Sequence, residues 1–212
     1  MPGMTLAAVH QSEADRLNME RRAFLALLRM SNTLSSPREI AQQLVIVVRE
    51  ISGCEAIGIR LKVGPEYPYV VTQGFTDSFV KLENSLCMED GEGRLLRDAQ
   101  RHPLLACMCG AVLSERVDPA QAFITERGSF WTNATSDLLA SAPALPLTCA
   151  IRNRCHTAGF ETVGLFPIRR DGVTYGMIQC NDVRRDRFTP ENLAMLEALA
   201  DGAAHLLQVT MA

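Results

Sequence analysis

The sequence predicts an α+β domain in which an antiparallel sheet carries helices on one face. Three observations support this class. An amphipathic helical segment precedes two short strand-like segments, two longer apolar segments come later in the chain, and a second amphipathic helical segment follows them. Helices that flank a run of strands at both ends are expected to pack on one face of the antiparallel sheet that those strands form.

The composition is that of a globular chain: of 212 residues, 47% are hydrophobic and 21% are charged. The formal net charge of −3 lacks the basic footprint of a nucleic-acid-binding domain. No apolar run approaches the roughly 18–20 residues that a membrane-spanning helix needs, and residues 1–22 lack the pattern of a secretory signal. We therefore expect a cytoplasmic protein that contacts neither nucleic acid nor membrane.

The chain divides into three parts. Residues 1–12 have no hydrophobic pattern and are expected to form a disordered tail. Residues 13–34 are rich in helix-forming residues and are interpreted as a signalling or dimer helix, because a minimal domain offers them no packing partner. Residues 35–210 are expected to form the folded domain, which a cysteine-bearing insertion interrupts at residues 83–158.

The folded domain is expected to open with a helix that begins after Ser36. Pro37 suits the first helical position, and Glu39 stands where a capping box places its carboxylate. Gly53 is expected to end the helix. One face of this helix carries the apolar residues Ile40, Leu44, Val47, Val48 and Ile51.

Four segments are expected to form strands: 55–63, 69–72, 161–168 and 173–183. The first alternates between apolar and polar residues, which is typical of a half-buried strand. The last two are joined through Asp171-Gly172, a pair that favours a tight hairpin turn. Thr189 and Pro190 then open a long amphipathic helix, with Thr as the cap and Pro at the first helical position.

The insertion at residues 83–158 contains too much cysteine and apolar material for a linker, and long irregular segments in compact domains are commonly functional. Within it, residues 106–113 are compact and apolar. Residues 128–133 are expected to form a central strand, and residues 135–140 a short helix. We therefore expect the insertion to carry the chemistry of the protein.

Four of the seven cysteines, Cys87, Cys107, Cys109 and Cys155, lie in three short polar contexts of this insertion. Thiolates are soft ligands, and four of them suit a tetrahedral zinc site or an iron–sulfur cluster. Coordination would also explain how an irregular segment becomes ordered. We predict a metal centre at these residues and place an iron–sulfur cluster ahead of zinc. A thiol redox switch and structural cysteines without a ligand stay open.

A family resemblance is carried by three stretches: Gly53-Cys54-Glu55-Ala56 before a strand, Gly74-Phe75 after the next strand, and the spaced pattern Gly176-Met-Ile-Gln-Cys-Asn-Asp182…Phe188-Thr-Pro-Glu191…Leu196…Leu199-Ala200. Over roughly residues 35–208 these stretches are similar to GAF domains. The cysteine-bearing insertion most resembles the GAF sensor domains found beside histidine kinases and other signalling modules of bacteria and archaea.

The resemblance implies a sheet of about five or six antiparallel strands, with terminal helices on one face and a loop-covered ligand pocket on the other. It implies a non-enzymatic sensory or regulatory domain that responds to redox state, a gas or a small ligand. It also implies a homodimer formed through the terminal helices, and a histidine kinase or another signalling protein as the partner. The sequence lacks the Asn-Lys-x-Asp-Glu-like signature of the GAF domains that bind cyclic nucleotides.

The insertion falls where a GAF domain builds the loops over its pocket. Phe130, Trp131, Arg152, Arg154 and His156 are therefore expected to lie in one pocket with the cysteines. The aromatic pair has core packing as its alternative, because aromatic side chains bury large apolar areas.

Two alternatives follow from the same resemblance. Some GAF sensors bind haem, for which His102, His156 or a cysteine is the candidate ligand. One GAF-like branch reduces free methionine sulfoxide with pocket cysteines, and Cys107 with Cys109, or Cys155, would serve that chemistry. The residues around these cysteines do not otherwise match that branch.

Overall fold

The computed structural model describes residues 6–33, 36–141 and 152–211. At its centre is a five-stranded sheet in the order β2-β1-β5-β4-β3, with every neighbouring pair antiparallel. The strands are β1 (Ala56–Leu61), β2 (Tyr69–Gln73), β3 (Phe130–Thr132), β4 (Thr162–Arg170) and β5 (Val173–Asp182). The predicted α+β class is confirmed.

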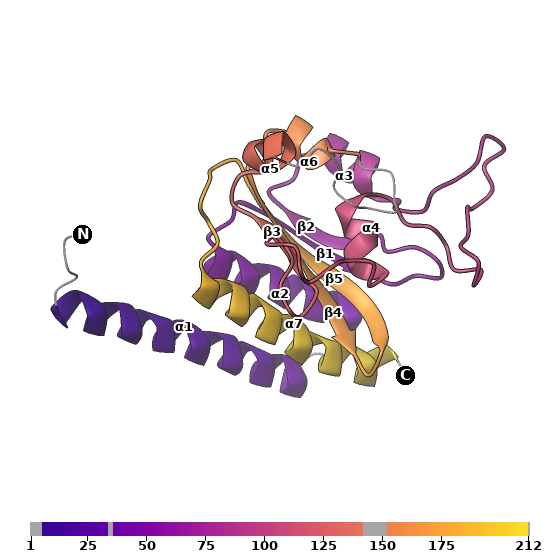
Figure 1. Cartoon of the computed structure of the whole chain (residues 1–212). Coiled ribbons are helices and arrows are strands. Elements are labelled where there is room, and N and C mark those ends of the chain that lie inside the picture. Colours follow the sequence, from indigo (N-terminus) through magenta and orange to yellow (C-terminus); the bar gives the residue numbers. More distant parts are fainter. Residues whose placement is uncertain (1–5, 34–35, 142–151, 212) are drawn as a thin grey trace.

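Helices cover the two faces of the sheet differently (Figure 1). The long helices α1 (Leu6–Thr33), α2 (Pro37–Ser52) and α7 (Pro190–Met211) lie on one side. The other side carries the short helices α3 (Asp77–Glu83), α4 (Cys107–Leu113), α5 (Thr135–Ser141) and α6 (Arg154–Thr157). The short helices of the insertion therefore lie across the sheet from the terminal helices, whereas Thr125 and Arg127 of the insertion contact α7 at Glu197 and Asp201. None of the described helices is both long enough and apolar enough to cross a membrane.

Helix α1 begins at Leu6, within the stretch expected to be a disordered tail. It packs on α2 and α7, and its N-terminal part extends past the body of the domain (Figure 1). Leu17, Phe24 and Leu28 on this helix are 52%, 61% and 43% exposed. The described chain thus leaves large apolar side chains of α1 uncovered.

The ends of α2 follow from its sequence. Ser36 Oγ accepts a hydrogen bond from Glu39 N at 3.3 Å, and Glu39 Oε2 accepts one from Ser36 N at 3.1 Å. This is the predicted capping box. Gly53 adopts a left-handed conformation with φ 63°, and its N–H donates to Arg49 O at 3.0 Å. The buried face of α2 packs in the core shared by α7 and the sheet.

The pairing of β4 with β5 forms the middle of the sheet. Their turn has Asp171 at φ 52° and Gly172 at φ 72°. Two successive positive φ values define a type I′ turn, which matches the twist of the flanking strands. The predicted Asp-Gly hairpin is confirmed.

Two strand expectations are wrong. Strand β1 is buried along its whole length, not half-buried. Ile57 and Ile59 pack in the helical core, while Arg60 points to the opposite face and is covered by the insertion. Strand β3 is an edge strand of three residues that pairs only with β4, so residues 128–133 do not form a central strand.

The first part of the insertion forms an arm, residues 86–105, that extends away from the body (Figure 1). Three short segments of the arm pair with one another through the bridges Cys87↔Leu105, Glu89↔Leu95 and Arg97↔Pro103. The carboxylates of Asp90 and Asp98 stabilise its two turns, because each accepts hydrogen bonds from backbone N–H groups two and four residues later.

Candidate functional site

A cavity of about 70 Å³ lies on the insertion side of the sheet, bounded by α4, α5, α6 and the adjacent strands. A cavity of this size has room for about five to seven water-sized groups. Its wall is largely apolar, and Met108, Phe130, Leu138, Leu139, Val163 and Leu165 contribute to it. The cavity therefore suits a small ligand with a mostly apolar body.

Helix α4 brings two thiols to this cavity, those of Cys107 and Cys109. Gly110 follows them and lies so close to Leu105 that a Cβ at position 110 would be 2.5 Å from the Leu105 carbonyl carbon. Cys109 is 4% exposed. The glycine thus allows α4 to pack tightly against the base of the arm and fixes both sulfur positions.

Helix α6 brings the third thiol, that of Cys155. The helix starts after Asn153, which has a left-handed φ of 53°. The Cys155 sulfur accepts a long hydrogen bond of 3.8 Å from Gln179 Nε2 on β5. His156 Nδ1 lies 3.1 Å from Thr135 Oγ1, a contact that links α6 to α5. Cys155 is thus held between the cavity and the sheet.

The fourth predicted ligand, Cys87, does not line the cavity. Its Sγ donates to Pro65 O at 3.4 Å, and its N–H donates to Glu66 Oε1, at the base of the arm. Within the described residues, no three or more His, Cys, Asp or Glu side chains form a group that could hold a metal ion. A centre with the four predicted cysteine ligands is therefore not preformed.

Burial sets the protonation of the cavity thiols. It is the main cause that raises the pKa of Cys155 to about 12, and the nearby Cys107 and Glu83 act in the same direction. Burial also raises the pKa of Cys109 well above its usual value. The Asn181 amide opposes the shift at Cys155. Cys109 and Cys155 are thus protonated, weakly nucleophilic thiols at neutral pH.

The predicted pocket residues fall into two groups. Phe130, Arg154 and His156 line the cavity. Trp131 packs instead against the helical core on the other face of the sheet, because neighbouring residues of a strand point to opposite faces. Arg152 lies outside the wall, where its Nη1 donates to Ser85 O at 2.8 Å.

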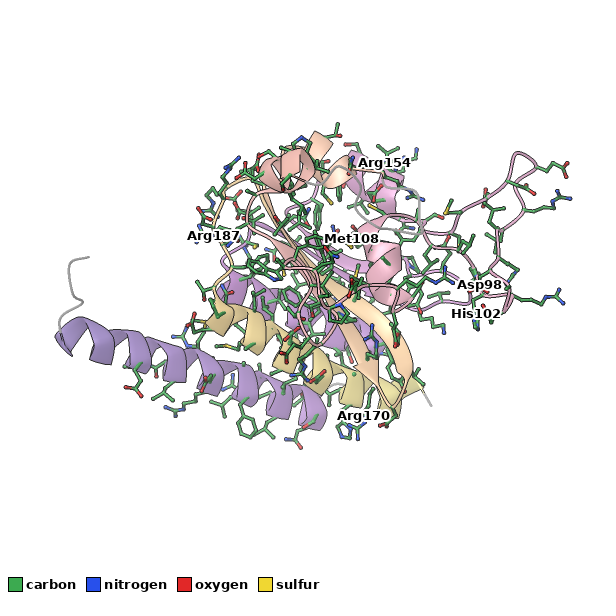
Figure 2. All side chains as sticks on the ribbon, in the orientation of Figure 1. Asp98, His102, Met108, Arg154, Arg170 and Arg187 are labelled. Atoms are coloured by element: carbon green, nitrogen blue, oxygen red, sulfur yellow. The ribbon has the colours of Figure 1, made fainter. Side chains whose placement is uncertain are left out.

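Three further residues that could have served as ligands, His102, Cys54 and Cys180, lie away from the cavity. His102 is on the arm near Asp98, and its side chain is 77% exposed (Figure 2). Cys54 and Cys180 are buried in the helical core, where they act as small apolar residues. Cys149 lies outside the described residues.

Arg60 is a buried residue that the sequence pattern did not single out. Its side chain is fully buried, and its guanidinium carbon lies 3.6 Å from the centroid of the Tyr69 ring. The Tyr69 hydroxyl donates to Gln179 Oε1 at 2.7 Å, so the chain of contacts leads on to the Cys155 sulfur. An arginine among the apolar residues of a strand was the available signal, but the alternation suggested a solvent-facing side chain.

Glu83, at the end of α3, joins two of the predicted arginines. Its Oε1 lies 2.9 Å from Arg154 Nη1 and 3.7 Å from Arg152 Nη1. The Glu83 side chain is 3% exposed. The shorter contact, from Arg154, is a charge-assisted hydrogen bond, which is stronger than a neutral one, and it connects α6 with α3 beside the cavity.

Comparison with known structures identifies the fold. The GAF domain of a phosphoenolpyruvate-protein phosphotransferase from Coxiella burnetii is 15% identical, with a TM-score of 0.57, over 92% of this chain and 94% of that one. The corresponding Acinetobacter domain is 12% identical, with the same TM-score and 92% and 93% coverage. The GAF domain of a proposed sensor histidine kinase from Pseudomonas syringae pv. tomato is 14% identical, with a TM-score of 0.54 and 98% and 94% coverage.

No curated protein matches the chain. The family model of the GAF domain matches residues 36–207, which is most of the sequence. That match covers the sheet, the insertion with its cavity, and the helices α2 and α7 that enclose the opposite face. The chain belongs to the GAF domain family.

Proposed function

We propose that this GAF domain is a non-enzymatic sensor that receives a small ligand in the thiol-lined cavity and signals through its terminal helices. One observation carries the proposal. Strand β4 places Val163 and Leu165 on the cavity wall, and Phe166 and Ile168 in the core beneath the terminal helices. A ligand that displaces the cavity-side residues of β4 therefore also changes how the residues on its opposite face pack against the terminal helices.

A signal requires that the ligand bind two arrangements of the terminal helices with different affinity. The exposed apolar residues Leu17, Phe24 and Leu28 on α1 support a homodimer formed through this helix. Histidine kinases and related signalling proteins of the cytoplasm are the proposed partners, by analogy with the proposed kinase from Pseudomonas syringae. Deletion of residues 1–33 is expected to weaken dimerisation in analytical ultracentrifugation.

A metal centre is the second candidate, because Cys107, Cys109 and Cys155 share one cavity. An iron–sulfur cluster comes first and zinc second, since both accept thiolate ligands. The thiols would have to move together, because the described residues hold no ready-made group of ligands. Haem has less support, since about 70 Å³ is small beside the roughly 300 Å³ or more of a typical cofactor pocket.

Metal analysis separates these versions. The full chain is purified without oxygen, and its visible absorption, iron, sulfide and zinc are measured. A visible band with stoichiometric iron and sulfide supports the cluster, and a colourless protein with stoichiometric zinc supports zinc. Metal-free protein with titratable thiols eliminates both and leaves the small-ligand sensor.

A further inference from the structure

Three guanidinium groups converge on residues 83 and 84 beside the cavity. Arg60 Nη2 donates to Glu83 O at 2.5 Å, and its Nη1 donates to Asn84 O at 3.2 Å. Arg154 and Arg152 both pair with the Glu83 carboxylate. Within the described residues, Glu83 is the one carboxylate that any of the three contacts as an ion pair.

The cluster therefore carries more positive than negative charge. Arg60 is fully buried, and within the described residues its guanidinium donates hydrogen bonds to the backbone carbonyls of Tyr67, Glu83 and Asn84. Removing a cation from water costs several kcal/mol unless an opposite charge compensates for it. Because Arg152 and Arg154 share a single carboxylate, one more anion would bring the charge of the cluster closer to balance.

Arg154 has the geometry to accept that anion. Its Nη1 is used by Leu82 O and Glu83 Oε1, while its Nε and Nη2 have no hydrogen-bond partner in the described part of the chain. These two N–H groups form the edge of a guanidinium that binds a carboxylate through two parallel hydrogen bonds. Arg154, the first residue of α6, also lines the cavity and lies beside α3, above Met108 in Figure 2.

The apolar wall and the volume of the cavity determine which chemical groups the ligand can carry besides an anion. Apart from Arg154 and His156, its wall is dominated by side chains such as Met108, Leu138 and Leu165. Such a wall favours hydrocarbon, which gains about 0.8 kcal/mol for each buried CH₂ group in simple transfer. The volume of about 70 Å³ limits the ligand to about five to seven non-hydrogen atoms.

We propose that the cavity binds a short-chain monocarboxylate, with its carboxylate on Arg154 and its hydrocarbon chain against the apolar wall. The inference rests on the proposed function in one respect, that the cavity is the place where the ligand is received. It adds the chemical class of the ligand and the residue that recognises it.

Calorimetric titration of the full chain with sodium butyrate, which has a carboxylate on a three-carbon chain, tests the proposal. Butyramide, its uncharged analogue, is the matched probe. Butyrate is expected to bind at least about tenfold more tightly than butyramide, because a hydrogen-bonded charge pair is worth about 1.5–3 kcal/mol. Affinity is expected to rise from acetate to butyrate and to fall again at octanoate, which exceeds the cavity.

Two variants and one control variant locate the site. Arg154→Gln is expected to weaken butyrate binding at least about tenfold, whereas Arg94→Gln on the arm, a side chain 71% exposed, is expected to leave it unchanged. Leu139→Phe, which fills the cavity and retains the arginine, is expected to abolish binding of butyrate and spare weak binding of acetate. Circular dichroism confirms that each variant is folded.

Equal affinity for butyrate and butyramide overturns the proposal, as does unchanged butyrate binding by folded Arg154→Gln. Affinity independent of chain length overturns it too, because the anion would then bind only at the surface. If butyrate binds as expected but leaves hydrogen exchange in α1 and α7 unchanged, the proposed signalling fails while the binding site stands. If a metal ion changes hydrogen exchange in α1 and α7 and no carboxylate does, the carboxylate site is wrong while the proposed signalling through the terminal helices stands.

Discussion

The Arg60 guanidinium lies over the ring of Tyr69, with its central carbon 3.6 Å from the ring centroid. The arginine belongs to β1 and the tyrosine to β2, so the contact joins neighbouring strands on the insertion side of the sheet. The aromatic face offers partial negative charge to a cation whose Nη1 and Nη2 groups donate to backbone carbonyls. The pair is linked to the thiol-lined cavity through Gln179, which accepts from the Tyr69 hydroxyl and donates to the Cys155 sulfur.

Substitution of Tyr69 is expected to separate the two contributions of its side chain. Tyr69→Phe retains the ring but removes the hydrogen bond to Gln179, and is expected to lower the free energy of unfolding by about 1–2 kcal/mol. Tyr69→Leu also loses the cation–π contact and is expected to cost about 3 kcal/mol. Urea unfolding measures both; equal losses would contradict a stabilising role for the stacked ring.

Glu83→Gln is expected to loosen α6. The substitution removes the carboxylate that pairs with Arg152 and Arg154, and it should lower the free energy of unfolding by about 1–2 kcal/mol, since both arginines are partly exposed. Labelling of Cys155 by a thiol reagent, followed by mass spectrometry, is expected to become faster. Glu115→Gln, which removes the ion pair of Arg169 with a 51% exposed partner, is the control and should label as the wild type does. Unchanged labelling in Glu83→Gln would show that the cluster does not restrain α6.

Gly110→Ala is expected to displace α4. Its Cβ would lie 2.5 Å from the backbone carbonyl of Leu105, so the helix and the base of the arm must separate. Overpacking of this kind costs about 1–3 kcal/mol. Gly91→Ala on the arm meets no atom within 4 Å and is expected to be nearly neutral. Thermal unfolding compares the two; similar melting temperatures would contradict the close packing of α4.

The ionised Glu66 carboxylate is expected to stabilise the base of the arm, and this stabilisation is expected to be lost at low pH. Burial acts to raise the pKa of this carboxyl, but hydrogen bonds from Ser85 Oγ and the N–H groups of Leu86 and Cys87 outweigh it, so the pKa is lowered from 4.5. A lowered pKa stabilises the fold above the unfolded-state value, and this contribution is lost as the pH falls through the folded-state pKa.

The stability difference between wild type and Glu66→Gln is therefore expected to be present at about pH 6 and to shrink towards about pH 3. Denaturant unfolding across this range measures the difference. Glu92→Gln is the matched control, because that side chain is 71% exposed at a turn of the arm. A difference that stays constant with pH would mean that the ionised Glu66 does not anchor the arm.

Much of the scaffold was predictable because local rules determine it. The Ser36 capping box, the left-handed Gly53 and the Asp171-Gly172 turn each depend on a few neighbouring residues, and each occurs as predicted. The antiparallel class followed from the order of these elements. Burial of β1 was mispredicted, because alternation around Arg60 shows which residues share a face but not what covers that face.

The site was harder to predict because long-range packing creates it. Cys87 was grouped with Cys107 and Cys109 because all three lie in the insertion, whereas the arm places it against Pro65 and Glu66. Trp131 was grouped with Phe130, although the pleat of β3 sends the two to opposite faces. The role of Glu83 was invisible, since its partners lie about 70 residues later in the chain.

Hydrogen exchange of the full chain before and after modification of the cavity thiols with methyl methanethiosulfonate tests whether the cavity communicates with the terminal helices. Altered exchange is expected in α1 and α7, across the sheet from the modified residues. The same treatment of a variant with Cys107→Ala, Cys109→Ala and Cys155→Ala is expected to leave those helices unchanged. Changes confined to α4, α5 and α6, or identical changes in the variant, would contradict a sensor that signals through its terminal helices.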